Sequence, residues 1–396
     1  MDLSFSPEQE EFRARVQGFL RDNLPPGWGQ AGFRPEGMSM TDFLRDWQRR
    51  LYEGGFLGMA WPKEFGGQGA SQIEMAIFNE EVARVRAPAP LNVLGLTMAA
   101  PTIITYGTDE QKKRYLSKIL SCEEIWCQGF SEPNSGSDLA AARTRAELKG
   151  DEFVVNGQKV WTTLGHIADW CMLVVRTDPD APKHRGLSYL LVDMKSPGIT
   201  VKPLRQMTGE SEFNEMFFED VHVPRQNLLG GLNEGWRVAT TTLMNERGTT
   251  ALASVMRYRI VFDEILDLVR SMTRNGAPAI SDPVVRQRLA QFYVELEMLR
   301  FTSYRAFSQI LRGGNPGPEG SISKLAWSEL NQRMQEFVIE LEGPASQLVK
   351  GSPYAVQGGR WQQHFLRSRG NTIEGGTSEI QRNIIAERVL GLPRAR

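Results

Sequence analysis

The 396-residue chain is poor in the residues that most often build metal centres and disulfide frameworks. It has three cysteines and four histidines. Neither set shows a metal-ligand spacing, so we expect no metal site and no Ser–His hydrolase. An odd number of scattered cysteines is typical of a reducing compartment, which predicts a cytoplasmic protein.

Long apolar runs and an excess of one charge are also missing. No stretch of about 18 apolar residues occurs, so we expect no membrane span, and the first residues lack the basic start and apolar centre of a signal peptide. The chain has 46 Lys and Arg against 47 Asp and Glu, for a net charge of −1. This balance argues against nucleic acid or an anionic membrane as the main partner. The length predicts two or three domains.

The spacing of apolar residues changes twice along the chain and divides it into three predicted domains. Residues 1–122 show helical spacing throughout. Ser6, Thr41 and Ser71 are expected to cap three helices, and Thr108 begins a capping box with a glutamine three residues later. We therefore expect an all-helical N-terminal domain.

Residues 123–232 form the predicted middle domain, in which short apolar runs are separated by Gly, Pro and Asp. The run from Phe153 to Trp161 is expected to be a β-hairpin with its turn at Asn156-Gly157. Strands without intervening helices predict an antiparallel barrel or sandwich. No G-x-G-x-x-G motif joins a strand to a helix, so a Rossmann-type cofactor site is not indicated.

Residues 233–396 return to helical spacing and form the predicted C-terminal domain. Helices are expected over residues 235–272, 282–311, 321–341 and 378–390, with breaks at clusters of Gly, Pro and Asn. The predicted fold class is thus a multi-domain α+β chain, with an N-terminal helical domain, a middle antiparallel β-barrel or sandwich domain and a C-terminal four-helix bundle.

The stretch Gln128–Asp138, Gln-Gly-Phe-Ser-Glu-Pro-Asn-Ser-Gly-Ser-Asp, is dense in small polar residues. Its hydroxyls and accessible backbone N–H groups suit cofactor phosphates and ring edges, although a surface loop of this composition is the other interpretation. Asn156–Thr163, Asn-Gly-Gln-Lys-Val-Trp-Thr-Thr, follows it, and then Ala168-Asp169. Together these segments resemble the flavin-binding middle domain of the acyl-CoA dehydrogenase family, and the resemblance extends over nearly the whole chain.

The resemblance implies an FAD-dependent enzyme that oxidises an acyl-CoA thioester to the 2,3-enoyl-CoA. In this family a glutamate removes the α-proton while the β-hydride passes to flavin N5, and the electrons leave to an electron-transferring flavoprotein. The implied flavin contacts are Gln128, Phe130, Ser131, Ser137, Trp161 and Thr163, with Thr377 and Glu379 on the adenosine half. Ser137 also matches a position near the CoA chain.

Several of these implied roles are physically reasonable. Phe130 and Ser131 would border the isoalloxazine with backbone and hydroxyl donors. Trp161 offers a large apolar face to the ring, although a core residue of the hairpin is the alternative. Thr163 could donate a hydrogen bond near N5, where negative charge develops on reduction.

Glu246 is the first candidate for the catalytic base. It lies inside a predicted long helix, where its i−4 and i+4 neighbours are Thr242 and Thr250 rather than cations. A carboxylate packed in apolar surroundings has a raised pKa, as a general base near neutral pH needs. The alternative is a structural ion pair with an arginine of another helix.

The family resemblance offers two locations for the base. Most members carry it directly before Gly-Thr-Ser near the C-terminus, where this chain has Gly375, with Glu374 one residue earlier. Some members carry it on the long helix before an arginine, which matches Glu246-Arg247. Glu246 is therefore the predicted base and Glu374 the alternative. Arg247 and Gly375 are predicted to contact substrate, Gly375 through a backbone N–H near the thioester carbonyl.

Two departures from the family pattern concern subunit contacts. The usual Arg-x-x-Phe-Gly is absent from residues 273–282, and the usual Gln-x-x-Gly-Gly appears as Glu-Leu-Glu-Gly-Pro over residues 340–344. Both fall where a neighbouring subunit's flavin would lie. A heterotetramer with a related chain, as in some steroid-degrading actinobacterial members, is therefore an alternative to a homotetramer, unless the changes are simple sequence drift. A flavin oxidase or monooxygenase on the same fold, and a non-catalytic subunit, also remain open.

Overall fold

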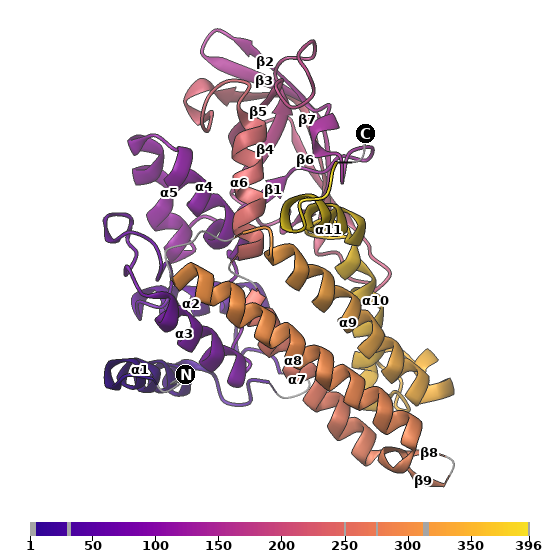
Figure 1. The fold of residues 1–396 in the computed structure, drawn as a ribbon. Helices are drawn as coiled ribbons and strands as arrows, with labels where there is room; N and C mark the ends of the chain where they lie inside the picture. The colour runs from indigo at the N-terminus through magenta and orange to yellow at the C-terminus, as the bar shows by residue number, and fades with distance from the viewer. Residues whose placement is uncertain (1–4, 30–32, 249–250, 275, 312–316, 395–396) are drawn as a thin grey trace. The chain divides into compact units, whose positions relative to one another are not determined.

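The computed structural model describes residues 5–29, 33–248, 251–274, 276–311 and 317–394 (Figure 1). The side chains of residues 246–254, 307 and 309–311 are outside this description. The chain forms two compact units, Met1–Glu246 and Arg247–Arg396.

The first unit begins with five α-helices. They are α1 (Pro7–Asn23), α2 (Met40–Glu53), α3 (Gln72–Arg84), α4 (Ala100–Tyr106) and α5 (Asp109–Ser121). Their apolar faces meet in a core that includes Val16, Leu20, Trp47, Ile77 and Ile119.

Helix caps explain where these helices start. Ser6, Ser71 and Thr108 each accept a hydrogen bond from the backbone N–H three residues later, which confirms all three caps, and each forms a capping box, as predicted for Thr108. The expected cap at Thr41 is wrong, because Ser39 accepts the bond from Asp42 N and α2 starts at Met40.

The middle part of this unit is a curled seven-stranded sheet. Its strands are β1 (Trp126–Gly129), β2 (Arg145–Lys149), β3 (Glu152–Thr163), β4 (Trp170–Arg176), β5 (Leu187–Asp193), β6 (Ile199–Leu204) and β7 (Phe213–Pro224). The order is β1-β4-β2-β3-β7-β6, with β5 paired to β4. Most pairings are antiparallel, but β4 runs parallel to β1 and to β2.

The hairpin predicted at Asn156-Gly157 is wrong. Strand β3 runs straight through this dipeptide, with a register irregularity against β7 between Val155 and Gly157. The turn lies instead between β2 and β3, where Gly150 has a φ of 62°. Gly157 is needed for a different reason, since a Cβ there would lie 2.6 Å from Thr144 Cα.

Helix α6 (Gly235–Gly248) follows the sheet and is anchored inside the first unit. The buried hydroxyl of Thr242 lies 3.0 Å from Thr102 Oγ1 on α4 and 3.3 Å from Tyr189 Oη on β5. This anchor lies one turn before Glu246 and fixes the path of the helix backbone there.

The second unit is helical. It contains α7 (Ala251–Ser271), α8 (Pro283–Leu311), α9 (Gly320–Glu342), α10 (Arg360–Ser368) and α11 (Ser378–Ile384), with the short strands β8 (Thr273–Arg274) and β9 (Ala277–Pro278) between α7 and α8. Apolar side chains from α7, α8 and α9 form its core, including Ile265, Phe292, Met334 and Phe337. Figure 1 shows these three helices side by side.

The predicted helices of the C-terminal part agree with these bounds except in two places. The helix expected over 235–272 is described as α6 and α7, and residues 249–250 between them lie outside the described residues. The last helix changes to π-helical geometry over Ile385–Val389. The division into domains 1–122, 123–232 and 233–396 stays a prediction.

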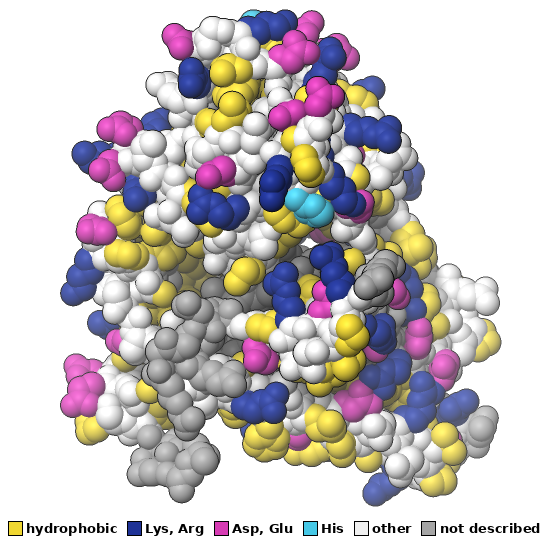
Figure 2. All heavy atoms as spheres, turned by 45° about the horizontal axis from the view of Figure 1, so that its top comes forward, with side chains coloured by type: hydrophobic (Ala, Val, Ile, Leu, Met, Phe, Trp, Pro, Cys, Tyr) yellow, Lys and Arg dark blue, Asp and Glu magenta, His cyan; other side chains and the backbone are white. Residues whose placement is uncertain are grey.

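The surface agrees with the balanced composition. Figure 2 shows Lys and Arg side chains interspersed with Asp and Glu on the face in view. Within the described part of the chain, no helix has both the length and the apolar character needed to cross a membrane.

Candidate functional site

Two neighbouring segments of the first unit carry the predicted flavin contacts. Gln128 lies in β1, next to its last residue, and Phe130 and Ser131 directly follow the strand, while Trp161 and Thr163 lie at the end of β3. The backbone N–H of Val160 donates to Ser131 O at 2.9 Å, which joins the segments directly. The structure thus brings these five residues together.

Ser137, the sixth predicted residue of this unit, lies on the exposed loop that follows. The loop is closed by a pair of backbone hydrogen bonds between Glu132 and Ser135. The Ser135 hydroxyl donates to Asp138 O at 2.7 Å. Ser137 is therefore presented to solvent on an ordered turn.

Trp161 is held in a strained and exposed position. Its φ is 61°, which is unusual for a bulky residue, and the pairing of β3 with β7 is irregular between Lys159 and Thr162. The side chain is 60% exposed and meets Phe213 edge-on, with ring centroids 5.9 Å apart. Trp161 is therefore not a core residue, and strain of this kind is concentrated at ligand sites.

A buried ion pair supports the two segments. Lys159, fully buried on β3, donates through Nζ to Glu132 Oε1 at 2.8 Å and to Phe130 O at 3.0 Å. The Glu132 carboxylate also accepts the backbone N–H groups of Arg143 and Thr144, at 2.7 and 2.8 Å. One ammonium and one carboxylate thus fix three stretches of backbone around the candidate site.

Burial and pairing shift the pKa values of both groups. Burial lowers the pKa of Lys159, and the neighbouring carboxylate opposes that shift. Burial also acts to raise the pKa of Glu132, but the charge and hydrogen bond of Lys159 outweigh it and the pKa is lowered. Sequence reasoning did not single out either residue, although both lie inside the two segments that carry the family resemblance.

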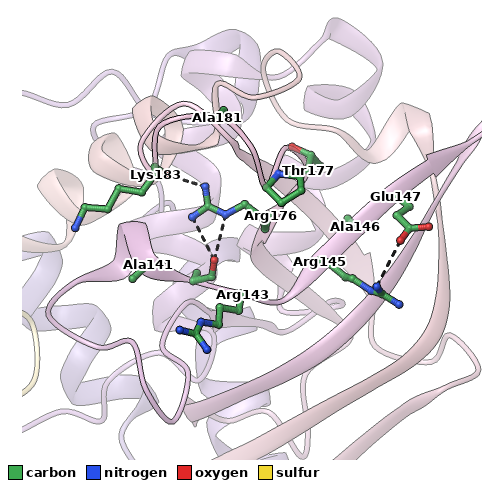
Figure 3. Close-up of a pocket in the computed structure, with 11 residues that line it drawn as sticks. Ala141, Arg143, Arg145, Ala146, Glu147, Arg176, Thr177, Ala181 and Lys183 are labelled. Atoms are coloured by element: carbon green, nitrogen blue, oxygen red, sulfur yellow. Dashed lines mark hydrogen bonds and ion pairs between the residues drawn. The ribbon is translucent and has the colours of Figure 1, made fainter.

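A cationic cavity of about 500 Å³ adjoins the Ser137 loop (Figure 3). Its lining includes Arg143, Arg145, Arg176 and Lys183. Lys183 Nζ reaches Asp138 Oδ2 at 2.7 Å and so links the cavity to the loop. The cavity suits a ligand with negative charge.

Arg176 has a structural part in this cavity. Its guanidinium donates to Ala140 O at 2.5 Å, to Ala142 O at 3.2 Å and to Lys183 O at 2.8 Å. Of these hydrogen bonds, Figure 3 draws those from Arg176 to Ala142 and to Lys183. The donors of Arg176 are therefore committed to the wall. Arg143, Arg145 and Lys183 are the other cations of the lining, of which Arg145 pairs with Glu147 at 3.7 Å and Lys183 with Asp138.

The predicted base, Glu246, and its neighbour Arg247 have side chains outside the described part of the structure. Helix α6 carries Glu246 and Arg247 on its backbone. Both side chains fall among residues 246–254, outside the described side chains. Their assigned roles stay predictions.

Glu374, the alternative base, is fully engaged. Its carboxylate accepts two hydrogen bonds from Arg367, at 3.2 and 2.8 Å, and one from Asn371 Nδ2 at 2.8 Å. Its backbone N–H donates to Gly370 O at 2.9 Å. A base must be free to take up a proton, and here proton uptake would disrupt a bidentate ion pair.

Thr377 and Glu379 lie where the chain enters α11. Thr377 caps this helix by accepting the N–H of Ile380 at 3.2 Å. Both residues line a cavity of about 540 Å³ that also contains Arg333 and Arg382. Hydrogen bonds from its own backbone N–H and from Thr377 lower the pKa of Glu379, so it is an anion.

Two buried polar atoms have no protein partner within the described residues and lie in the predicted cofactor regions. One is the hydroxyl of Thr162, between Trp161 and Thr163, and the other is the hydroxyl of Ser378, in the cavity lined by Thr377. Buried hydroxyls are normally hydrogen-bonded, so both regions fit a polar ligand. Among the described residues, no cluster of three or more metal-ligating side chains occurs.

Three family models match consecutive parts of the chain. The acyl-CoA dehydrogenase N-terminal domain matches residues 6–123, the middle domain residues 127–221 and the C-terminal domain residues 233–390. The chain therefore belongs to the acyl-CoA dehydrogenase family and is an oxidoreductase of that family.

Individual relatives cover nearly the whole chain. The acyl-CoA dehydrogenase IpdE1 of Mycolicibacterium smegmatis is 42% identical over 98% of both chains. Among solved structures, a chain of the ChsE4-ChsE5 complex from Mycobacterium tuberculosis is 34% identical, with a TM-score of 0.84 and full coverage of both chains. A chain of the Tcur3481-Tcur3483 steroid acyl-CoA dehydrogenase is 31% identical, with a TM-score of 0.83 and full coverage of both chains.

Proposed function

We propose that this protein is an FAD-dependent acyl-CoA dehydrogenase that oxidises an acyl-CoA thioester to the 2,3-enoyl-CoA. The observation that carries the proposal is the joined pair of segments around Ser131 and Trp161. An exposed, strained tryptophan lies beside a loop rich in backbone donors, and the buried Lys159–Glu132 pair holds both. This arrangement suits a planar aromatic cofactor with polar edges.

The residues present fit FAD in both units. In the first, Phe130 and Ser131 would border the ring system, Trp161 would pack on it and Thr163 would donate a hydrogen bond to it, with Gln128 and Ser137 as further contacts. In the second, Thr377 and Glu379 would meet the adenosine half of an FAD held by the same or a neighbouring subunit. Bound FAD would supply the hydride acceptor, at N5, for the hydride of the substrate β-carbon.

Glu246 is the proposed base and removes the substrate α-proton. The engagement of Glu374 by Arg367 and Asn371 supports this choice, because the alternative carboxylate already serves an ion pair. The backbone N–H near Gly375 stabilises the negative charge that develops on the thioester carbonyl oxygen. Arg247 contributes to substrate binding.

The cationic cavity supports the acyl-CoA part of the proposal. CoA carries phosphate groups, and Arg143, Arg145 and Lys183 offer positive charge beside Ser137. The names of the relatives suggest a substrate class. One related structure is described as a steroid acyl-CoA dehydrogenase, so a steroid-derived acyl-CoA is the first candidate here.

The assembly is proposed to be mixed. The related structures ChsE4-ChsE5 and Tcur3481-Tcur3483 each combine two different chains, and this chain departs from the family pattern at 273–282 and 340–344. We therefore favour a heterotetramer with a related chain over a homotetramer. An electron-transferring flavoprotein is the proposed electron acceptor and the cytoplasm the proposed location.

The visible spectrum of the purified chain, expressed alone and with a related chain, tests the cofactor. A panel of acyl-CoAs, including steroid-derived ones, is then added without oxygen. Bleaching of the flavin by particular thioesters is the expected result. A yellow protein that no thioester bleaches, and whose reduced form reacts quickly with dioxygen, would instead indicate an oxidase or monooxygenase.

Matched variants test the base. Glu246→Gln should retain FAD but lose bleaching by at least about a hundredfold in rate, whereas Glu374→Gln should retain much of it. Full activity in Glu246→Gln would refute the assignment of the base and transfer it to Glu374. A chain that stays colourless in every combination would favour a non-catalytic subunit.

A further inference from the structure

The turn Glu374–Gly376 is held by side chains that sequence reasoning does not assign to any role. Gly375 and Gly376 have φ values of 63° and 93°, which favour glycine. Gln381 Nε2 donates to Gly375 O at 3.0 Å and to Gly376 O at 3.2 Å. Lys324 Nζ donates to Gly376 O at 2.7 Å and to Asn371 O at 2.9 Å.

These two donors are buried, so their contacts are strong and fixed. Lys324 is 7% exposed and Gln381 is fully buried. A charged donor makes a shorter and stronger hydrogen bond than a neutral one, and burial protects it from competing water. The carbonyls of Gly375 and Gly376 therefore have little freedom to rotate.

Fixing the carbonyls also fixes the N–H groups of the same peptides. A trans peptide directs its C=O and N–H to opposite sides. Because Gln381 and Lys324 hold the carbonyls of Gly375 and Gly376 on one side, the N–H groups of Gly376 and Thr377 point to the other. On the N-terminal side of the turn, Glu374 is tied through its carboxylate to Arg367 and through its N–H to Gly370.

The N–H groups of this turn are available to a ligand. Within the described residues, no hydrogen bond uses the N–H of Gly375, Gly376 or Thr377. The Gly375 N–H lies between two fixed points, the tied Glu374 and the Gly375 carbonyl held by Gln381. A backbone donor aimed before the reaction stabilises developing negative charge without reorganisation.

We infer that Lys324 is a positioning residue, which, with Gln381, aims the backbone N–H groups of Gly375, Gly376 and Thr377 at the thioester carbonyl oxygen of the substrate. Lys324 does not touch the substrate and acts through the Gly376 carbonyl. Glu374 belongs to the same support rather than to the proton transfer. The inference rests on the proposed function, because it takes the acyl thioester as the ligand.

A conjugated aryl-acryloyl-CoA tests the inference without turnover. Hydrogen bonds to the carbonyl of such a thioester shift its absorption to longer wavelength, so the spectrum reports how well the donors are aimed. The FAD-loaded protein, in whichever assembly holds FAD, is compared as wild type, Lys324→Met and Lys324→Arg. Lys350→Met, which changes an exposed lysine of the same unit, is the matched control.

The wild type and Lys350→Met should show the full red shift. Lys324→Met should lose most of it, with kcat lowered about 10- to 100-fold and KM changed little. Lys324→Arg should restore part of both, because it keeps a charged donor. A purely structural role for Lys324 would lower the flavin content or the unfolding midpoint without changing the spectrum of the bound thioester.

Two results would overturn the inference. One is a folded, FAD-loaded Lys324→Met with the wild-type red shift and a kcat within twofold of wild type. If Lys324→Met does not fold, Gln381→Leu tests the same inference at the Gly375 carbonyl. An unchanged red shift of the bound thioester in Gln381→Leu would equally overturn the inference. A wild type that binds no acyl thioester overturns the proposed function as well, so the two failures are distinguishable.

Discussion

The buried pair of Lys159 and Glu132 gives the sharpest stability prediction. Lys159→Met keeps the length and apolar stem of the side chain but removes the ammonium. Glu132 then keeps its two backbone donors but loses its only buried cation within the described residues. The Phe130 carbonyl loses its donor as well.

The expected loss follows from leaving a buried charge without its partner. Breaking a buried pair on one side typically costs about 3–5 kcal/mol. The loss for Lys159→Met should lie near the lower end of this range, because Glu132 keeps its two backbone donors. Glu132→Gln should cost at least as much, because it removes the counter-charge of a fully buried ammonium and replaces one acceptor oxygen by an NH2 group that cannot accept the bonds now made by Glu132.

The double variant Lys159→Met/Glu132→Gln removes both charges together. It should be more stable than the sum of the single losses predicts, with an interaction energy of about 1–3 kcal/mol. Urea unfolding followed by far-UV circular dichroism measures the stability of the wild type, the two single variants and the double variant. Lys195→Met, which removes the exposed partner of Asp169, is the control and should leave the midpoint nearly unchanged.

The same variants test whether the pair supports the cofactor region. Lys159→Met should also weaken binding of FAD, because it frees the backbone that borders the ring. Strict additivity in the cycle, or a Lys159→Met protein as stable as wild type, would refute the reasoning. Either result would mean that the pair does not hold the segments around Phe130.

Three further predictions concern single sites. Burial raises the pKa of Glu342 to about 7 in the folded protein, against about 4.3 when unfolded. The stabilising contribution of the protonated carboxyl should therefore be fully present below about pH 4 and be lost as the pH rises through 7. Glu342→Gln should remove this pH dependence from the unfolding midpoints. Gly157→Ala should cost about 1–3 kcal/mol in urea unfolding, because its Cβ would lie 2.6 Å from Thr144 Cα. Trp161→Ala should weaken FAD binding about tenfold by titration of the apoprotein, roughly 1.4 kcal/mol, without lowering stability, because the side chain is 60% exposed.

Features that depend on neighbours in sequence were predictable. Capping involves residues three apart, so Ser6, Ser71 and Thr108 were identified correctly. The order of helical and strand regions follows from the spacing of apolar residues and agrees with the structure. The family resemblance then supplied the predicted flavin contacts, which the spacing alone does not reveal.

Features that depend on distant contacts were not predictable. Asn156-Gly157 reads locally as a turn, but β3 continues through it because Thr144 approaches Gly157 from outside the segment. Lys159 lies in an ordinary strand pattern, and nothing in that pattern shows that it is buried against Glu132, 27 residues away. Similarly, only the fold shows that Glu374 is committed to Arg367.

The hydrogen bonds from Arg176 to three backbone carbonyls have a consequence for how the cationic cavity would bind an anionic ligand. One guanidinium fastens the backbone at Ala140, Ala142 and Lys183 to the end of β4. The wall is thus preorganised, and an entering ligand would order little backbone. Backbone amides around this wall should exchange hydrogen at nearly the same rate with and without ligand. Ligand binding should instead change the side chains of Arg143 and Lys183.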